Sequence, residues 1–116
     1  MQYMVLIYEN EANYRDYADS PEMKAIVAKH YALAGELGDK LKAGAGLQSI
    51  TTATTVVTAP DGAQTVHDGP FAETREQLGG YYLVEAKDLD TALAIAARVP
   101  GAKTGSIEVR PIMIYD

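Results

Sequence analysis

The chain has 116 residues, a net charge of −6, a hydrophobic fraction of 47% and no cysteine. This size and apolar fraction predict that residues 1–116 form a single globular domain. A chain without cysteine has no disulfides, thiolate nucleophiles or cysteine-based metal sites. The acidic balance argues against nucleic-acid binding, no apolar run reaches membrane-spanning length, and without an apolar leader we expect a cytoplasmic protein.

The chain opens with a pattern typical of a buried strand. Residues 3–8 (YMVLIY) are apolar at every position, which predicts a central strand covered on both faces. Residues 9–19 are polar and predict a loop that Tyr14 and Tyr17 hold against the domain. Residues 20–22 (SPE) predict a helix start, because serine caps free N–H groups, proline suits the first helical position and glutamate suits the positive helix end.

The predicted helix has an apolar stripe at steps of three or four residues. The stripe consists of Met23, Ile26, Val27, His30, Leu33, Leu37 and Leu41. Gly38 weakens the pattern near its end, so we expect the helix to stop near Lys42. Gly44 and Gly46 then predict terminating turns.

The middle of the chain predicts a hairpin and a further strand. Residues 48–59 are rich in threonine and valine, residues 60–62 (PDG) predict a turn, and residues 64–67 return. Residues 68–77 (DGPFAETREQ) predict a turn-rich connector. Residues 79–86 (GGYYLVEA) predict a strand with apolar residues on both faces.

The chain closes with a helix and a strand. Asp88 predicts a helix cap, and residues 100–101 (PG) predict the helix end. The small apolar face of this helix consists of Leu89, Ala92, Leu93 and Ala96. Residues 106–115 predict the final strand, in which Pro111 marks a bulge or an edge.

The predicted order β-α-β-β-β-α-β corresponds to the split βαβ arrangement of ferredoxin-like α+β domains, with an added strand or hairpin. Two helices cover only one face of such a sheet, yet the strands are apolar on both faces. Soluble monomers rarely expose a large apolar patch. We therefore expect a homodimer packed sheet to sheet, closing a dimeric α+β barrel.

His30 is the first candidate for chemistry, because it places an imidazole on the buried stripe of a helix. A structural histidine bonded to a neighbouring strand is an equally good interpretation. His67 and Asp68 are adjacent in an extended segment, so their side chains point to opposite sides and do not form a dyad with each other. Asp68 is expected either to accept from turn amides or to orient a histidine.

Further residues are candidates for ligand binding. Glu73 and Glu76 share one face if their segment is helical, although such charges usually form a solvated surface. Arg110 lies in an otherwise mainly apolar or small-residue strand, where it holds an anionic ligand or pairs with a glutamate. Aromatic residues line a ligand pocket or belong to the core: Tyr8, Phe71, Tyr81 and Tyr82. We expect no metal or cofactor, because two distant histidines give no recognisable metal spacing.

The segment from residue 68 to residue 111, which begins DGPF and ends VRP, resembles the YCII-related family in its branch named for the D-G-P-F motif. The resemblance extends upstream to residues 3–8 and to the helix that carries His30. It implies a dimeric α+β barrel with a pocket between sheet and helices, and an acid/base pair at positions matched by His30 and Asp68. His67 stands where the branch more often has threonine or another small polar residue. Further matches to the motif are Gly69, Pro70, Phe71, Glu73, Glu76, Gly79, Gly80, Arg110 and Pro111.

Two functions follow as hypotheses. The first is a cofactor-independent acid/base enzyme acting on a small aromatic or lactone-like molecule, in which His30 moves a proton, Asp68 orients it and Arg110 holds an anionic group. The second is a non-enzymatic dimeric domain that binds a ligand or a regulatory protein, with a sigma factor as one partner, since this branch also occurs beside sigma-factor genes. A cavity lined by His30, Phe71 and tyrosines favours the first hypothesis, and a filled interior favours the second.

Overall fold

The computed structural model describes all residues except 14–19, 103 and 116. The predicted loop anchors Tyr14 and Tyr17 lie outside the described residues. The strands are β1 (Gln2–Glu9), β2 (Leu41–Gly46), β3 (Thr54–Thr58), β4 (Gln64–Asp68), β5 (Gln77–Glu85) and β6 (Ser106–Pro111), and the α-helices are α1 (Pro21–Leu37) and α2 (Leu89–Ala96). Short 3-10 turns are η1 (Glu11–Asn13), η2 (Gly38–Lys40) and η3 (Ile50–Thr52).

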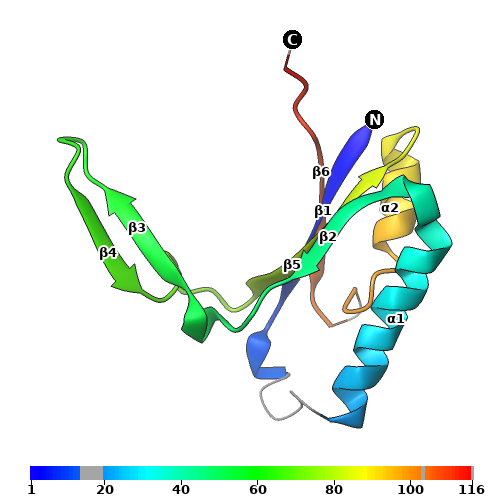
Figure 1. Cartoon of the computed structure of the whole chain (residues 1–116), viewed down its shortest axis with the longest axis horizontal. Helices are drawn as coiled ribbons and strands as arrows, with labels where there is room; N and C mark the ends of the chain where they lie inside the picture. The colour runs from blue at the N-terminus through cyan, green and yellow to red at the C-terminus, as the bar shows by residue number, and fades with distance from the viewer. Residues whose placement is uncertain (14–19, 103, 116) are drawn as a thin grey trace.

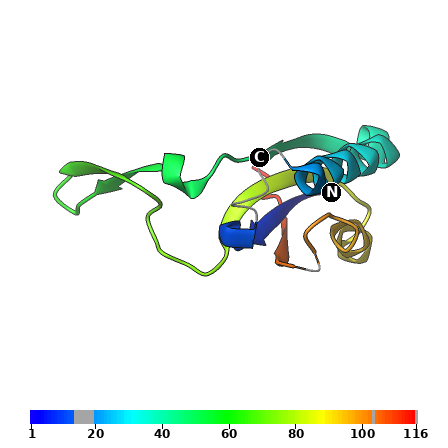
Figure 2. The ribbon, with the colours of Figure 1, turned by 90° about the horizontal axis from the view of Figure 1, so that it is seen from below.

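Four strands form one antiparallel sheet in the order β2-β5-β1-β6, and both helices lie on the same face of it (Figures 1 and 2). This is the split βαβ order of a ferredoxin-like α+β domain, which confirms the predicted fold class. Strands β3 and β4 form a separate two-stranded sheet, inserted between the second and third strands of the main sheet. The added hairpin was predicted, and the structure places it outside the four-stranded sheet.

The segment after α1 differs from its prediction. The helix ends at Leu37, where Gly38 caps it with a positive φ of 54°. Residues 41–46 (LKAGAG) then form strand β2, which pairs with β5, so the predicted turns at Gly44 and Gly46 are wrong. Glycine and alanine have low strand propensity, and pairing with the strongly β-forming strand β5 overrides it here. Leu41 therefore belongs to the sheet and not to the helix stripe.

Both helix starts follow the sequence closely. The Ser20 hydroxyl accepts from the amide of Met23 at 3.2 Å, as the helix-start signal predicted. The Asp88 carboxylate accepts from the amide of Thr91 at 2.8 Å and from its hydroxyl at 2.6 Å, and these bonds lower the pKa of Asp88. The strand expected from residue 48 begins only at Thr54, after the 3-10 turn η3, and α2 ends at Ala96, before the predicted stop at residues 100–101. Strand β6 ends at Pro111, four residues before the predicted Tyr115, and it is an edge strand as the proline indicated.

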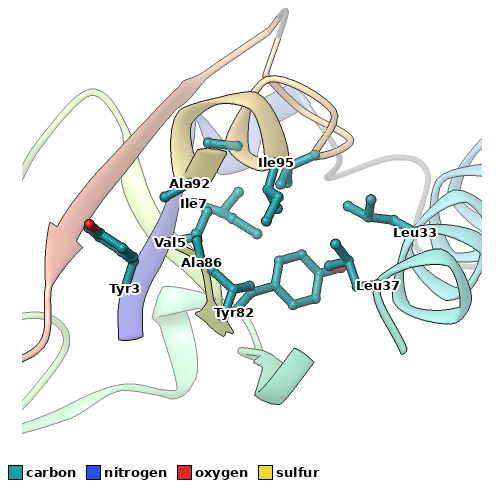
Figure 3. Close-up of a cluster of buried hydrophobic side chains, with 12 residues drawn as sticks. Tyr3, Val5, Ile7, Leu33, Leu37, Tyr82, Ala86, Ala92 and Ile95 are labelled. Carbon is teal, nitrogen blue, oxygen red and sulfur yellow. The ribbon is translucent and has the colours of Figure 1, made fainter. Parts of the chain in front are cut away.

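The core lies between the helix-bearing face of the sheet and the two helices. Val5 and Val84 are fully buried at its centre, and the ring of Tyr82 reaches from β5 toward Leu37 of α1 (Figure 3). The remaining core residues are Tyr3, Ile7, Leu33, Ala86, Ala92, Ile95, Ala96 and Val99. Alternation along β1 and β5 assigns the buried side chains to this face and half-buried ones to the other.

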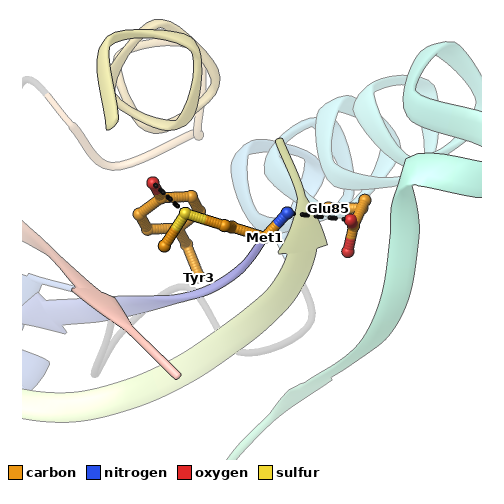
Figure 4. A network of polar contacts seen from close by, with 3 residues as sticks. All are labelled: Met1, Tyr3 and Glu85. Carbon is orange, nitrogen blue, oxygen red and sulfur yellow. Dashed lines mark hydrogen bonds and ion pairs between the residues drawn. The ribbon is translucent and has the colours of Figure 1, made fainter. Parts of the chain in front are cut away.

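The N-terminus is tied to the neighbouring strand. The amino group of Met1 bonds the carboxylate of Glu85 at 2.9 Å, and the Tyr3 hydroxyl contacts the Met1 sulfur (Figure 4). The amide of Ala86 donates to the carbonyl of Met1 at 2.9 Å. These contacts extend the pairing of β1 with β5 to the end of the chain.

The β3–β4 hairpin projects away from the rest of the molecule (Figures 1 and 2). We call residues 53–71, which include β3, β4 and the D-G-P-F turn, the arm. The amide of Gly69 donates to the carbonyl of Ala53 at 2.7 Å and closes the base of this arm. The radius of gyration is 16.2 Å, against about 13 Å for a compact chain of this length.

Candidate functional site

A groove of about 820 Å³ opens between the first half of α1 and the strands β2 and β5. The helix side of the groove consists of Met23, Ile26, Val27, His30, Tyr31 and Ala34. The predicted apolar stripe of α1 therefore divides into two parts. Leu33 and Leu37 are buried in the core, whereas Met23, Ile26 and His30 are only half-buried and line the groove.

Part of the sheet side of the groove is built from glycine and alanine residues. Gly46 of β2 pairs with Gly80 of β5, and Gly44 pairs with Tyr82. A Cβ atom on Gly44 would lie 2.7 Å from the Tyr82 ring, so only glycine lets this ring lie across β2. A Cβ atom on Gly46, two residues along the same face, would meet nothing within 4 Å. The floor beside Tyr82 is thus flat and open.

His30 and Tyr82 form a hydrogen-bonded pair in the wall of the groove. His30 Nδ1 bonds the Tyr82 hydroxyl, and the two rings lie at 45° with centroids 5.8 Å apart. Burial lowers the pKa of His30 and raises the pKa of Tyr82. Both shifts favour the uncharged form, so the pair is a neutral imidazole beside a protonated phenol at pH 7.

One end of the groove carries polar groups that are already bonded. The Glu11 carboxylate accepts from the Ser49 hydroxyl at 2.7 Å and from the amide of Ile50 at 2.8 Å. The Gln77 side-chain oxygen accepts from the amide of Glu11 at 3.0 Å, and its amide nitrogen donates to the carbonyl of Thr74 at 2.5 Å. These bonds fix both chain segments that lead into the arm.

The structure places the predicted site residues in three regions. His30 and Tyr81 border the groove. His67 and Asp68 lie on β4 in the arm, exposed, with no side-chain hydrogen bond to either among the described residues. Within one chain His30 therefore bonds Tyr82 and not Asp68, and the predicted His30–Asp68 pair remains a prediction. The turn that follows Asp68 is held instead by the Thr55 hydroxyl, which donates to the Gly69 carbonyl at 2.7 Å.

The remaining predicted residues lie outside the groove. Phe71, at the base of the arm, is 85% exposed. Glu73 is exposed and Glu76 accepts from the Ser106 hydroxyl at 2.7 Å, in a segment without helical structure. The helical face that Glu73 and Glu76 were predicted to share is therefore absent.

Two predicted residues belong to the face of the sheet that no helix covers. Tyr8 is half-buried on β1, and Arg110 is exposed on β6, opposite Met4. In the described part of the chain Arg110 has no ion pair. Its expected glutamate partner is thus not found, and the guanidinium remains available on this face.

Sequence reasoning missed three features of the groove. Tyr82 was treated only as one of several aromatic residues, Gly44 and Gly46 as turns, and the polar contacts of Glu11 were not considered. A signal for Tyr82 existed, because alternation from the buried Val84 places it on the helix-bearing face, toward His30. Nothing in the sequence indicates that the glycines of β2 face a tyrosine across a strand pair.

The described residues contain no gathering of three histidine, cysteine or carboxylate side chains suited to a metal ion. In the same part of the chain, neither helix has the length and apolar character needed to cross a membrane.

Comparison with known proteins shows the family of this chain and its similarity to a further protein and to a solved structure. The YCII-related domain family matches residues 1–115. An uncharacterized protein of Rhizobium meliloti (strain 1021) is 36% identical over 122 residues, covering 99% of this chain and 94% of that protein. The 5-chloro-2-hydroxyhydroquinone dehydrochlorinase TftG of Burkholderia phenoliruptrix, solved in complex with 2,5-dihydroxybenzoquinone, has a similar fold, with a TM-score of 0.57, 14% identity, and coverage of 97% of this chain and 94% of that one.

Proposed function

This chain belongs to the YCII-related domain family, and we propose that its groove binds a small, planar, hydroxylated aromatic molecule and that His30 exchanges a proton with a hydroxyl of this ligand. The observation that carries the proposal is the hydrogen bond between His30 Nδ1 and the Tyr82 hydroxyl in the groove wall. We further assign the chain to the D-G-P-F branch on residues 68–71 and treat it as one domain.

The proton chemistry follows from the His30–Tyr82 pair. The bond to Tyr82 occupies Nδ1, and Nε2 makes no hydrogen bond to any described residue. A neutral imidazole with a free Nε2 takes the proton of an acidic ligand hydroxyl, so that the ligand O–H bond breaks and an N–H bond forms. In this tautomer Nδ1 carries the hydrogen and donates it to the Tyr82 oxygen before and after the transfer, and this bond stabilises the imidazolium.

The shape of the groove supports a flat ligand. Its volume of about 820 Å³ lies within the usual range for small-molecule sites. The glycine floor beside Tyr82 admits a ring face, and Met23 and Ile26 offer apolar contacts from the helix. The TftG structure holds a hydroxylated quinone as its ligand, which makes 2,5-dihydroxybenzoquinone a reasonable first probe.

We also propose that two copies pair through the helix-free face of the sheet and close a dimeric α+β barrel. Met4, Leu6, Tyr8 and Leu83 are half-buried on this face, where a second copy would remove them from water. Sedimentation velocity at micromolar concentration tests this arrangement. A cytoplasmic location stays a prediction from the sequence, and cell fractionation tests it.

Equilibrium dialysis with 2,5-dihydroxybenzoquinone tests the groove. The His30→Gln substitution is expected to weaken binding at least tenfold, because a lost charge-assisted hydrogen bond costs about 1.5–3 kcal/mol. His67→Gln makes the same change outside the groove and is expected to leave binding unchanged. Gly46→Leu fills the open floor and is expected to abolish binding while the circular dichroism spectrum stays native.

Two outcomes would contradict the proposal. Equal losses in the His30 and His67 variants would mean that the probe does not use His30. Unchanged binding in Gly46→Leu would mean that the groove is not the site.

A further inference from the structure

We propose that the arm of one copy docks at the groove of a second copy and supplies Asp68 and Phe71 to its mouth. This inference deepens the proposed function and rests on it, because it completes the same site with residues from a partner. It also explains why the arm, which carries the D-G-P-F turn, projects away from α1, the helix that carries His30, within a single chain (Figures 1 and 2).

One face of the arm is suited to packing against a protein surface. The register of β3 and β4 places Val56 opposite Val66, and these side chains are 58% and 66% exposed. Asp68 lies two residues from Val66 and shares its face, whereas His67 points to the opposite face. Phe71, the only phenylalanine of the chain, follows three residues after Asp68 and is 85% exposed. Docking of this apolar face therefore brings Asp68 into the contact.

The arm is not stabilised by its own sheet. A lone two-stranded hairpin is marginally stable in water, and three strands or a packed face are usually needed. Among the described strands, β3 pairs only with β4, and neither joins the four-stranded sheet. In a single copy, Val56 and Val66 therefore remain exposed to water, and packing against a second surface would stabilise the arm.

The root of the arm prevents it from folding back over its own groove. On one side, the Glu11 carboxylate holds Ser49 and Ile50. On the other side, Gln77 holds the Thr74 carbonyl and the Ser106 hydroxyl holds Glu76. With both connections fixed, the arm leaves the body in one direction, away from α1 (Figure 2).

Charge and position indicate that the arm binds to a second copy of the chain. Asp68 is the only charged residue on the Val56–Val66 face, and it needs a cation or donor once it leaves water. The groove is lined by one cation, Lys42, which has no carboxylate partner in the described part of the chain. It is also lined by two carboxylates, Glu9 and Glu11, of which Glu11 is already bonded to Ser49 and Ile50.

The position of the root agrees with a reciprocal exchange. Leu47 and Gln77, which begin and end the two connections to the arm, both line the groove. The arm and the groove mouth therefore meet at one end of the molecule. A two-fold axis near that end places each arm at the groove of the other copy, so both contacts form together.

The absence of native cysteine permits a clean cross-linking test. Lys42→Cys in one preparation and Phe71→Cys in a second, larger tagged preparation are mixed and treated with a short bismaleimide. We expect a mixed product of the two chains on a denaturing gel. Thr65→Cys, on the opposite face of the arm, is the matched control and is expected to give little product with Lys42→Cys.

Charge insertion gives an independent measurement of the same contact. Val66→Lys is expected to raise the dimer dissociation constant about tenfold or more, because it removes a buried valine from the interface. Thr65→Lys places the same charge on the other face and is expected to leave the constant unchanged. Analytical ultracentrifugation measures both variants, and their circular dichroism spectra verify the fold.

The outcomes separate this inference from the proposed function. A mixed product that disappears in Val66→Lys supports arm exchange. No mixed product from the two single-cysteine preparations, or a monomer that still binds 2,5-dihydroxybenzoquinone, overturns the exchange and leaves the groove proposal standing. Arm exchange without probe binding overturns the proposed function alone.

Discussion

Replacing Gly44 by alanine tests whether the close approach of β2 to Tyr82 builds the His30–Tyr82 pair. The new Cβ atom would lie 2.7 Å from Cδ1 and 3.2 Å from Cε1 of Tyr82, and 3.3 Å from the Tyr81 carbonyl oxygen. Ordinary carbon contacts are about 3.5–4.0 Å, so the ring must move by roughly 0.8 Å or more. Tyr82 is 8% exposed and packed in the core, so this movement has a cost (Figure 3).

The magnitude combines three effects. Overpacking costs about 1–3 kcal/mol, and losing the hydrogen bond between His30 and Tyr82 costs about 0.5–1.5 kcal/mol. Alanine offsets about 0.5–1 kcal/mol by restricting the unfolded chain. We expect Gly44→Ala to lower the free energy of unfolding by about 0.5–4 kcal/mol. Gly46→Ala, with nothing within 4 Å of its new Cβ, is expected to be neutral or stabilising by up to about 1 kcal/mol.

Urea denaturation measures both free energies, and NMR titration of the His30 ring measures its pKa. We expect the pKa of His30 to change in Gly44→Ala and to stay constant in Gly46→Ala. Equal stability of the two variants with an unchanged His30 titration would falsify the claim that glycine at position 44 positions Tyr82.

Three further predictions concern stability. Gly35→Ala, at an exposed helix position where the new Cβ atom would meet nothing within 4 Å, should raise the free energy of unfolding by about 1 kcal/mol in urea denaturation. Gly38→Ala, where φ is +54°, should lower this free energy by at least about 1 kcal/mol. The opposite order would contradict the assigned helix end. Val5→Ala, at a fully buried site, should lower the free energy of unfolding by about 2–3 kcal/mol, and Val57→Ala, at a site that is 47% exposed, should lower it by less than about 1 kcal/mol. Equal urea midpoints for the two variants would refute the assigned core. Because burial lowers the pKa of His30 below its unfolded value of about 6.5, the unfolded chain takes up this proton first, and the free energy of unfolding should decline as pH falls below about 6.5 until the folded pKa is reached. In a pH series of urea titrations, the His30→Gln variant should lose the part of this decline that His30 causes. An identical pH slope in the variant and the unchanged protein would contradict the prediction.

The predictable part of the fold is the part with strong local signals. Residues 3–8 and 79–86 are apolar at nearly every position, and they became the central strands β1 and β5. Ser20 and Asp88 marked both helix starts because a capping side chain acts on amides only three residues away. Such signals depend on neighbours in the chain, so one sequence is enough to find them.

Strand β2 carries no such signal. Its residues 41–46 (LKAGAG) combine a helix-like beginning with glycines, and local propensity favours the end of a helix and a turn. What makes them a strand is pairing with β5, nearly 40 residues later, where Gly46 meets Gly80 and Gly44 meets Tyr82. That information lies in the contact between two segments and not in either one.

The candidate site divides in the same way. His30 was found because the period of α1 directs it toward the sheet. Alternation along β5 places Tyr82 on the helix-bearing face, but the contact between the two residues became evident only once the strand register was known. Asp68 was assigned to His30 by family resemblance, and the fold of one chain sends it out on the arm. A residue pair suggested by the family and separated within the protomer is what an exchanged site produces, because the contact that joins the pair then lies between two copies and has no trace in the packing of one.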